Sequence, residues 1–158
     1  MKVAILCGGY GTRIRDVADD LPKPMIPIGG YPIIWHIMKY YASFGHDEFI
    51  LCLGYKSNVI KDYFLNYEAR TTDFSITLGK KDSIEILNNH TEQNWKITFA
   101  ETGLDSMTGT RIKKIQKYIN PGESFMLTYG DGLSNINIDK LISYHNSHGK
   151  SLTLSGVK

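Results

Sequence analysis

The sequence predicts an α/β fold in which a mixed, mostly parallel sheet is flanked by helices. The segments 2–7 and 48–53 each carry an uninterrupted apolar run, a pattern typical of strands that are buried on both faces. Each run leads into a glycine-containing loop, and a segment with apolar residues at helical spacing follows. Because strand–helix–strand alternation joins parallel neighbours by right-handed crossovers, these patterns favour one sheet with helices on its faces.

Local signals place the helices of the first half. Pro32 suits the start of a helix and Gly45 its end, so the apolar spacing between them predicts a helix over 33–44. After the second strand, Ser57 is predicted to cap a helix over 58–67.

The second half continues the alternation with less regular patterning. The basic segment 110–118 is predicted to be an amphipathic helix whose lysines face solvent. Gly149 is predicted to end a helix over 137–148. The strands expected here are two short ones at 74–78 and 83–87, then 96–101, 124–129 and 151–157.

Composition limits the class of protein. The 158 residues, 42% hydrophobic and 22% charged, suit one globular domain over 1–158. A net charge of +2 gives no reason to expect a nucleic-acid or membrane partner, and no apolar run reaches the roughly 18 residues of a membrane span. Cys7 and Cys52 lie in apolar runs and are expected to be buried thiols, which fits a cytoplasmic location, as does the lack of a signal-peptide pattern.

The loop after the first strand is the strongest candidate site. Gly8, Gly9 and Gly11 let the backbone approach a ligand closely, and successive amide groups can then bind an anion. Arg13 adds a planar fork that matches phosphate oxygens, and Lys23 adds a point charge between two prolines. The pattern is neither a P-loop nor a dinucleotide fingerprint, and the glycines alone are equally compatible with a simple turn.

Taken together, residues 8–13 and 23–25 resemble the signature of the sugar-1-phosphate nucleotidylyltransferases: Gly-Gly-x-Gly-Thr-Arg, a spacer, then Lys-Pro-Met. The segments 28–38, 102–111 and 128–132 are similar to the cytidylyl branch of that family, the glucose-1-phosphate cytidylyltransferases. The resemblance covers essentially the whole chain.

Several expectations come from the resemblance alone. It implies the Rossmann-like nucleotide-diphospho-sugar transferase fold, and it implies that this chain is the N-terminal, nucleotide-binding portion of a longer enzyme. The rest of such an enzyme would hold much of the sugar pocket and a second metal-binding aspartate. It further implies a homo-oligomer, a trimer or hexamer, that serves nucleotide-sugar synthesis for surface polysaccharides such as O-antigen.

The implied reaction is transfer of a cytidylyl group from CTP to glucose 1-phosphate, giving CDP-glucose and pyrophosphate. Arg13 and Lys23 are the catalytic residues by this resemblance, and both would neutralise phosphate charge. The nucleotide-binding residues it implies are Leu6, Gly8, Gly9, Gly11, Thr12, Arg13, Lys23, Thr102, Gly103 and Arg111. Thr110 stands where the family usually has a second glycine, which leaves the conformation of that loop open.

Asp131 is the candidate metal ligand. It lies between two glycines just after a predicted strand, from where a carboxylate can reach a Mg²⁺ that also binds substrate phosphates. The residues alone fit a turn equally well, and the resemblance favours the Mg²⁺ ligand. Because ligands bind at the carboxyl ends of strands in open α/β sheets, segments 8–13, 103–111 and 130–132 are expected to converge.

Two other functions stay open from the sequence. A thymidylyl- or uridylyltransferase uses the same scaffold, and competition among CTP, UTP and dTTP would distinguish it. A nucleotide-binding module without turnover is the second, because the portion that would carry the further aspartate lies outside these 158 residues.

Overall fold

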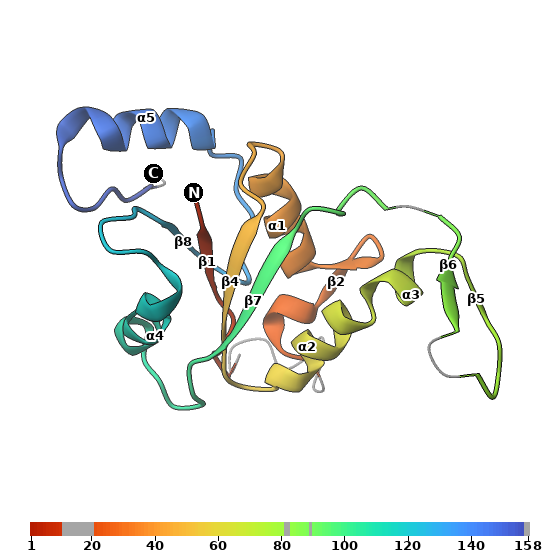
Figure 1. The fold of residues 1–158 in the computed structure, drawn as a ribbon. Coiled ribbons are helices and arrows are strands. Elements are labelled where there is room, and N and C mark those ends of the chain that lie inside the picture. The colour runs from red at the N-terminus through yellow and green to blue at the C-terminus, as the bar shows by residue number, and fades with distance from the viewer. Residues whose placement is uncertain (11–20, 81–82, 89, 157–158) are drawn as a thin grey trace.

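The centre of the protein is a four-stranded sheet with the strand order β7-β4-β1-β8 (Figure 1). The computed structural model describes residues 1–10, 21–80, 83–88 and 90–156. Every neighbouring pair in this sheet is parallel, and the register places Val3 of the central strand between Phe49 and Met126. The predicted mostly parallel α/β fold is confirmed.

Along the chain, the strands of the central sheet alternate with α-helices. The strands of the central sheet are β1 (Val3–Leu6), β4 (Glu48–Leu53), β7 (Lys96–Glu101) and β8 (Met126–Tyr129). The α-helices are α1 (Ile33–Ala42), α2 (Ser57–Leu65), α3 (Tyr67–Thr71), α4 (Thr108–Ile115) and α5 (Ile138–His148). Short 3₁₀ turns cover Lys23–Met25 and Gln116–Tyr118, and two small antiparallel pairs join β2 (Pro27–Ile28) to β3 (Tyr31–Pro32) and β5 (Phe74–Ile76) to β6 (Ile84–Ile86).

Both faces of the sheet are covered, which explains the uninterrupted apolar runs. On one face, alternate residues of β1 and β4 pack in a single cluster with apolar residues of α1, α2 and α5. On the other face, Ala4, Ile50, Cys52 and Ala100 pack with Ile115 of α4. Burial on two sides holds the strands rigidly, so their carboxyl ends form a fixed edge.

Most expected elements occur within one or two residues of their predicted bounds. The predicted helix over 58–67 is instead two helices, because the backbone at Asn66 leaves the helical region. Ser57 is the first residue of α2 and does not cap it; its hydroxyl binds the Glu101 carboxylate instead. The residue before α2, Lys56, adopts the left-handed conformation with φ 49°.

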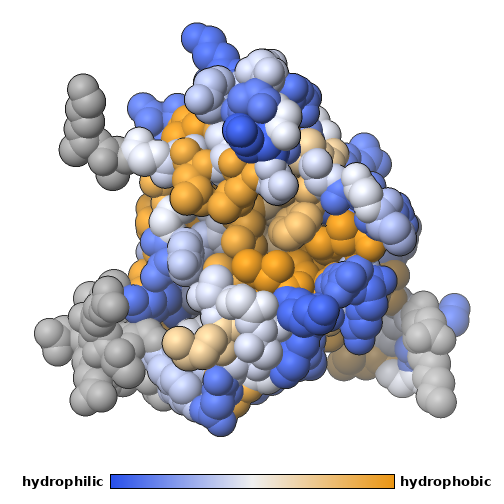
Figure 2. Space-filling model, turned by 90° about the vertical axis from the view of Figure 1, so that its left-hand side faces the viewer, coloured by the Kyte–Doolittle hydropathy of each residue, from blue (hydrophilic) through white to orange (hydrophobic). Residues whose placement is uncertain are grey.

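The predicted strand over 151–157 is wrong for its described part, residues 151–156, which form no strand. This segment folds back on α5, where His145 and His148 each contact the Thr153 hydroxyl at 2.8 Å. The segment therefore hydrogen-bonds to α5 through Thr153 and does not pair with β8, which lies at an edge of the central sheet. Apolar side chains gather on this side of the molecule (Figure 2), and the exposed leucines of β8 and the segments after it are Leu127, Leu133, Leu152 and Leu154.

Candidate active site at the carboxyl edge of the sheet

A pocket of about 260 Å³ lies where the central strands end, and four separate parts of the chain line it. The loop after β1 supplies Gly8 and Gly9, and the turn at Lys23–Met25 supplies Lys23. The start of α4 and the end of β8 complete the wall. The lining residues are Leu6, Cys7, Gly8, Gly9, Lys23, Pro24, Ser106, Met107, Thr108, Arg111, Tyr129, Gly130 and Asp131. Described parts of all three predicted segments, at 8–9, 106–111 and 130–131, thus converge on one pocket.

Arg111 is buried at the base of this pocket and ties the strand ends together. Its Nη1 donates to the Leu53 carbonyl at 3.0 Å and to the Thr102 hydroxyl at 2.7 Å. Its Nη2 donates to the carbonyls of Gly8 at 2.9 Å and Leu104 at 3.1 Å. These four bonds use all four Nη hydrogens of the guanidinium, and only the Nε–H remains for other acceptors.

The Arg111 guanidinium thus binds groups of the protein itself, whereas the resemblance implied contact with the nucleotide. Nucleotide contact by Arg111 stays a prediction, while the bonds present here hold the ends of β1, β4 and β7 in one arrangement. The sequence predicts that this arginine lies near the site. No sequence pattern identifies the acceptors of the guanidinium, because they are mostly backbone carbonyls.

Gly8 has a specific steric role beside that guanidinium. A Cβ atom at Gly8 would lie 2.1 Å from the Arg111 Nη1, whereas a Cβ at Gly9 would meet nothing within 4 Å. We expect Gly8→Ala to displace the guanidinium and lower the free energy of unfolding by about 2–3 kcal/mol. Gly9→Ala is the matched control and should change it by less than about 0.5 kcal/mol. Urea denaturation of both variants measures this, and equal stabilities would contradict the steric argument.

Lys23 and Asp131, two of the predicted site residues, lie together. The Lys23 Nζ is 3.5 Å from the Asp131 Oδ2, and both side chains are partly exposed to the pocket. Tight packing around Gly130 brings them close. A Cβ atom added at Gly130 would lie only 3.0 Å from the Pro24 Cγ and 3.1 Å from the Cys7 Sγ. Burial raises the pKa of the Cys7 thiol well above its ordinary value, which disfavours the thiolate, and the buried side chain forms part of the pocket wall.

The remaining predicted residues divide into three groups. Leu6 and Gly9 line the pocket, and nucleotide contact by them stays a prediction. Thr102 and Gly103 lie behind the lining: the Thr102 hydroxyl is fully buried and donates to the Leu53 carbonyl at 2.6 Å, and Gly103 has a φ of 96°. The predictions for Gly11, Thr12 and Arg13 fall outside the described residues.

Some residues of the site were missed by the sequence reasoning. Tyr129 ends β8 and is 61% exposed beside Asp131, a position that its neighbouring Gly-Asp-Gly turn could have indicated. Lys114 is predicted from the sequence to face solvent, yet its Nζ donates to the Thr102 carbonyl at 2.7 Å and the Ser106 hydroxyl at 3.1 Å. Tyr10 donates to Asp105 at 2.6 Å, which links the loops after β1 and β7, and this bond raises the pKa of the phenol.

The site fits a metal ion only in part. Within the described ranges, no three His, Cys, Asp or Glu side chains are grouped so that they could hold an ion. Among the described residues that line the pocket, Asp131 is the one that offers a carboxylate, and it is paired with Lys23. Mg²⁺ prefers one or two carboxylates completed by substrate phosphates and water, so one aspartate is compatible with an ion delivered together with a triphosphate.

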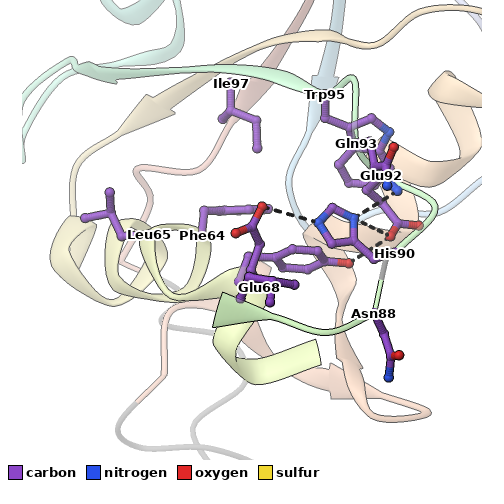
Figure 3. Close-up of a pocket in the computed structure, with 11 residues that line it drawn as sticks. Phe64, Leu65, Glu68, Asn88, His90, Glu92, Gln93, Trp95 and Ile97 are labelled. Carbon is purple, nitrogen blue, oxygen red and sulfur yellow. Dashed lines mark hydrogen bonds and ion pairs between the residues drawn. The ribbon is translucent and has the colours of Figure 1, made fainter. Parts of the chain in front are cut away.

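A second polar cluster lies away from this site, in a pocket of about 370 Å³ beside α2 and α3 (Figure 3). Its centre is the buried Glu92 carboxylate, which accepts hydrogen bonds from Lys39 Nζ at 2.5 Å, Thr91 Oγ1 at 2.5 Å and Tyr67 Oη at 3.2 Å. His90 Nδ1 lies 3.5 Å from the same carboxylate. Every Glu92 oxygen thus has a protein donor, which marks the cluster as a structural link between α1, α3 and the segment before β7.

Glu92 should make stability depend on acid pH. Burial raises the pKa of this carboxyl, but hydrogen bonds from Lys39, Thr91 and Tyr67 outweigh it and hold the pKa below the ordinary 4.5. A lowered pKa contributes stability above the unfolded value, and that stability is lost as the pH falls through the folded value. We expect Glu92→Gln to cost about 1–3 kcal/mol at neutral pH, with the difference from wild type shrinking below about pH 4.5.

The control for this variant is Glu48→Gln. Glu48 pairs with Lys96 at 3.6 Å on the surface, where both side chains are largely exposed, so its loss should cost at most about 0.5 kcal/mol at any pH. Denaturation curves at several pH values measure both variants. A Glu92→Gln penalty that is constant with pH would show that the charge is not what stabilises the cluster.

Comparison with known proteins places the whole chain in one family. The family model described as nucleotidyl transferase matches residues 2–158. A Bacillus subtilis protein named probable glucose-1-phosphate cytidylyltransferase is 51% identical over 158 residues, which is 99% of this chain and 60% of that protein. The glucose-1-phosphate cytidylyltransferase of Salmonella typhimurium is 43% identical over 157 residues, again 99% of this chain and 60% of that one. The chain thus spans about 60% of the length of these relatives.

Solved structures agree with the fold. HddC from Yersinia pseudotuberculosis, crystallised with GMP-PN, superposes with a TM-score of 0.65 and is 31% identical, covering 91% of this chain and 53% of that one. A UDP-glucose pyrophosphorylase in complex with UDP-glucose gives a TM-score of 0.64 at 17% identity, over 93% of this chain and 53% of that one, and so supports the fold alone. The glycine-rich loop, Lys23 and Asp131 meet at one edge of the sheet. Since the family model matches residues 2–158, this chain belongs to the nucleotidyl transferase family.

Proposed function

We propose that this chain is the nucleotide-binding portion of a glucose-1-phosphate cytidylyltransferase, which transfers a cytidylyl group from CTP to glucose 1-phosphate. The observation that carries the proposal is the single pocket in which Gly8, Gly9, Lys23 and Asp131 meet. The names of the relatives at 51% and 43% identity support the choice of CTP and glucose 1-phosphate over other substrates.

In this proposal the reaction needs no protein nucleophile. A phosphate oxygen of glucose 1-phosphate attacks the α-phosphorus of CTP, the bond to the β-phosphate breaks, and pyrophosphate leaves. The backbone of Gly8 and Gly9 approaches the triphosphate, and Lys23 stabilises the charge that develops at the α-phosphorus. Arg13 is proposed to hold the leaving phosphates, by the resemblance of its motif.

We propose Mg²⁺ as the metal, with Asp131 as its ligand in this part of the chain. When bound, the ion would neutralise phosphate charge on the triphosphate. The Lys23 ammonium is 3.5 Å from the same carboxylate, so it would be free to turn toward the α-phosphate once Asp131 has another positive partner.

The test is calorimetric titration of this chain with CTP and Mg²⁺, with UTP and dTTP as competitors. Selective binding of CTP that depends on Mg²⁺ supports the proposal, and preference for UTP or dTTP selects the other nucleotidyltransferases. Pyrophosphate release with glucose 1-phosphate then separates an active enzyme portion from a module that binds without turnover. Binding of none of the three nucleotides would contradict the proposal for this chain.

Two further parts of the proposal concern the setting of the reaction. We place it in the cytoplasm, since Cys7 and Cys52 are both free and buried, as is usual under reducing conditions. No helix in the described ranges is long and apolar enough to cross a membrane. We also propose that the protein acts as a homo-oligomer in the synthesis of surface sugars such as O-antigen.

A further inference from the structure

The Ser106 hydroxyl lies between two polar groups of the protein that form a closed triangle with it. The Lys114 Nζ donates to the Ser106 Oγ at 3.1 Å, and the Ser106 Oγ donates to the Thr102 carbonyl at 2.6 Å. The same ammonium also donates to the Thr102 carbonyl, at 2.7 Å. Of these three residues, Ser106 is the one that lines the candidate active site.

This triangle fixes the direction in which the Ser106 hydroxyl points. An ammonium can only donate hydrogen bonds and a carbonyl oxygen can only accept them. The hydroxyl must therefore accept from Lys114 and donate its single proton to Thr102. A hydroxyl oxygen has two lone pairs, and Lys114 uses one of them. The half-buried Ser106 thus offers the pocket one acceptor and no donor.

The backbone around the triangle holds the hydroxyl in this arrangement before any ligand binds. Gly103 has a φ of 96°, and a Cβ atom there would lie 3.1 Å from both the Lys114 Nζ and the Ser106 Oγ. The Arg111 Nη2 holds the Leu104 carbonyl at 3.1 Å, in the middle of the segment that the triangle closes. The acceptor is therefore preorganised, so a ligand need not order it on binding.

The stretch of pocket lining that carries Ser106 suits the nucleoside part of a nucleotide. Residues 106–108 line the pocket without a charged side chain, whereas Lys23 and the backbone of Gly8 and Gly9 are the groups proposed for the triphosphate. A fixed acceptor would repel phosphate oxygens, which carry lone pairs themselves. It would instead bind a group that donates a hydrogen bond.

We propose that the Ser106 oxygen selects cytosine over uracil and thymine by accepting a hydrogen bond from the 4-amino group of the base. The proposal rests on the proposed function, since it names the feature that makes the nucleotide site prefer CTP. Cytosine carries an N4 amino donor where uracil and thymine carry an O4 acceptor. With UTP or dTTP, two acceptors would face each other unpaired, which disfavours binding. Lys114 is a positioning residue that keeps the hydroxyl proton turned toward Thr102.

The test is calorimetric titration with CTP and with UTP in the presence of Mg²⁺, and its readout is the ratio of the two dissociation constants. Wild type should bind CTP at least about tenfold more tightly than UTP. Ser106→Ala removes the acceptor and should reduce this preference to less than about threefold, chiefly by weakening CTP. Lys114→Met frees the hydroxyl to turn and donate to O4, so the preference should fall at least about threefold through tighter binding of UTP relative to CTP.

The matched control is Lys113→Met, which removes an exposed cation from the same helix and should keep the wild-type ratio. A ratio that Ser106→Ala leaves unchanged would overturn the inference even if both affinities fell, because Ser106 would then bind a part common to the two nucleotides or only support the fold. A wild-type preference for CTP would in that case still support the proposed function. A wild type that binds UTP as tightly as CTP, or that binds neither, would overturn the inference and the choice of CTP together.

Discussion

Replacing Arg111 by alanine is expected to lower the free energy of unfolding by about 3–5 kcal/mol, the largest effect on stability that we expect from one substitution in this chain. The guanidinium is buried and donates to three carbonyls and the Thr102 hydroxyl. Alanine leaves these acceptors without their donor in a space that excludes bulk water. Because the Gly8 carbonyl is one of them, the glycine-rich loop should lose its position and CTP affinity should fall as well.

Arg111→Lys separates charge from geometry. A lysine ammonium is a point charge that cannot reach four acceptors arranged around a planar fork, so we expect it to recover less than half of the lost stability. Lys113→Ala, on the exposed side of the same helix, is the control and should be close to neutral. Chemical denaturation and CTP titration measure all three variants. Equal stability of Arg111→Ala and Lys113→Ala would show that the guanidinium does not hold the strand ends.

Under the proposed function, Lys23→Ala is expected to lower the rate of cytidylyl transfer by about 100- to 1000-fold, the largest effect on that activity. A preorganised cation beside the reacting phosphorus stabilises the transition state more than the bound substrate. CTP affinity should therefore fall much less than the rate. Stability should hardly change, because the pair that Lys23 forms with Asp131 is 3.5 Å long and partly exposed.

The measurement combines initial rates of pyrophosphate release with calorimetric CTP affinity, in protein that shows turnover. Lys140→Ala removes an exposed cation from α5 and serves as the control. If Lys23→Ala lost CTP affinity and rate by the same factor, Lys23 would be a binding residue without a special role in the transition state.

Much of the fold could be predicted because its signals are local. The continuous apolar runs of β1 and β4, Gly45 after α1 and Gly149 after α5 each act over a few residues. The strand expected over 151–157 failed for the opposite reason: its apolar residues fit a strand, but a strand needs a neighbour to pair with. No sequence pattern states that α5 takes Thr153 as a hydrogen-bond partner instead.

The candidate site was likewise predictable only where its signals are local in the sequence. Glycines and cations after strands were recognisable, and the parallel topology brought Lys23 and Asp131 to one pocket. The bonds of Arg111 and Lys114 were not foreseeable, since their acceptors are largely backbone carbonyls, which every residue carries. The Glu92 cluster joins Lys39 and Tyr67 from distant parts of the chain, and only the packing of α1 against α3 reveals it.

The strand order has a consequence for how the protein reaches its folded state. The central strand β1 pairs with β4, which follows it closely in the chain, and with β8, which comes near the end. Contacts of high sequence separation form late, because closing the long loop costs chain entropy before the pairing is gained. The β1–β4–β7 unit can therefore assemble while β8 is still unpaired. Asp131 follows β8, so the pocket would be the last part of the molecule to form and the first to open, and amide exchange in β8 should be faster than in β1.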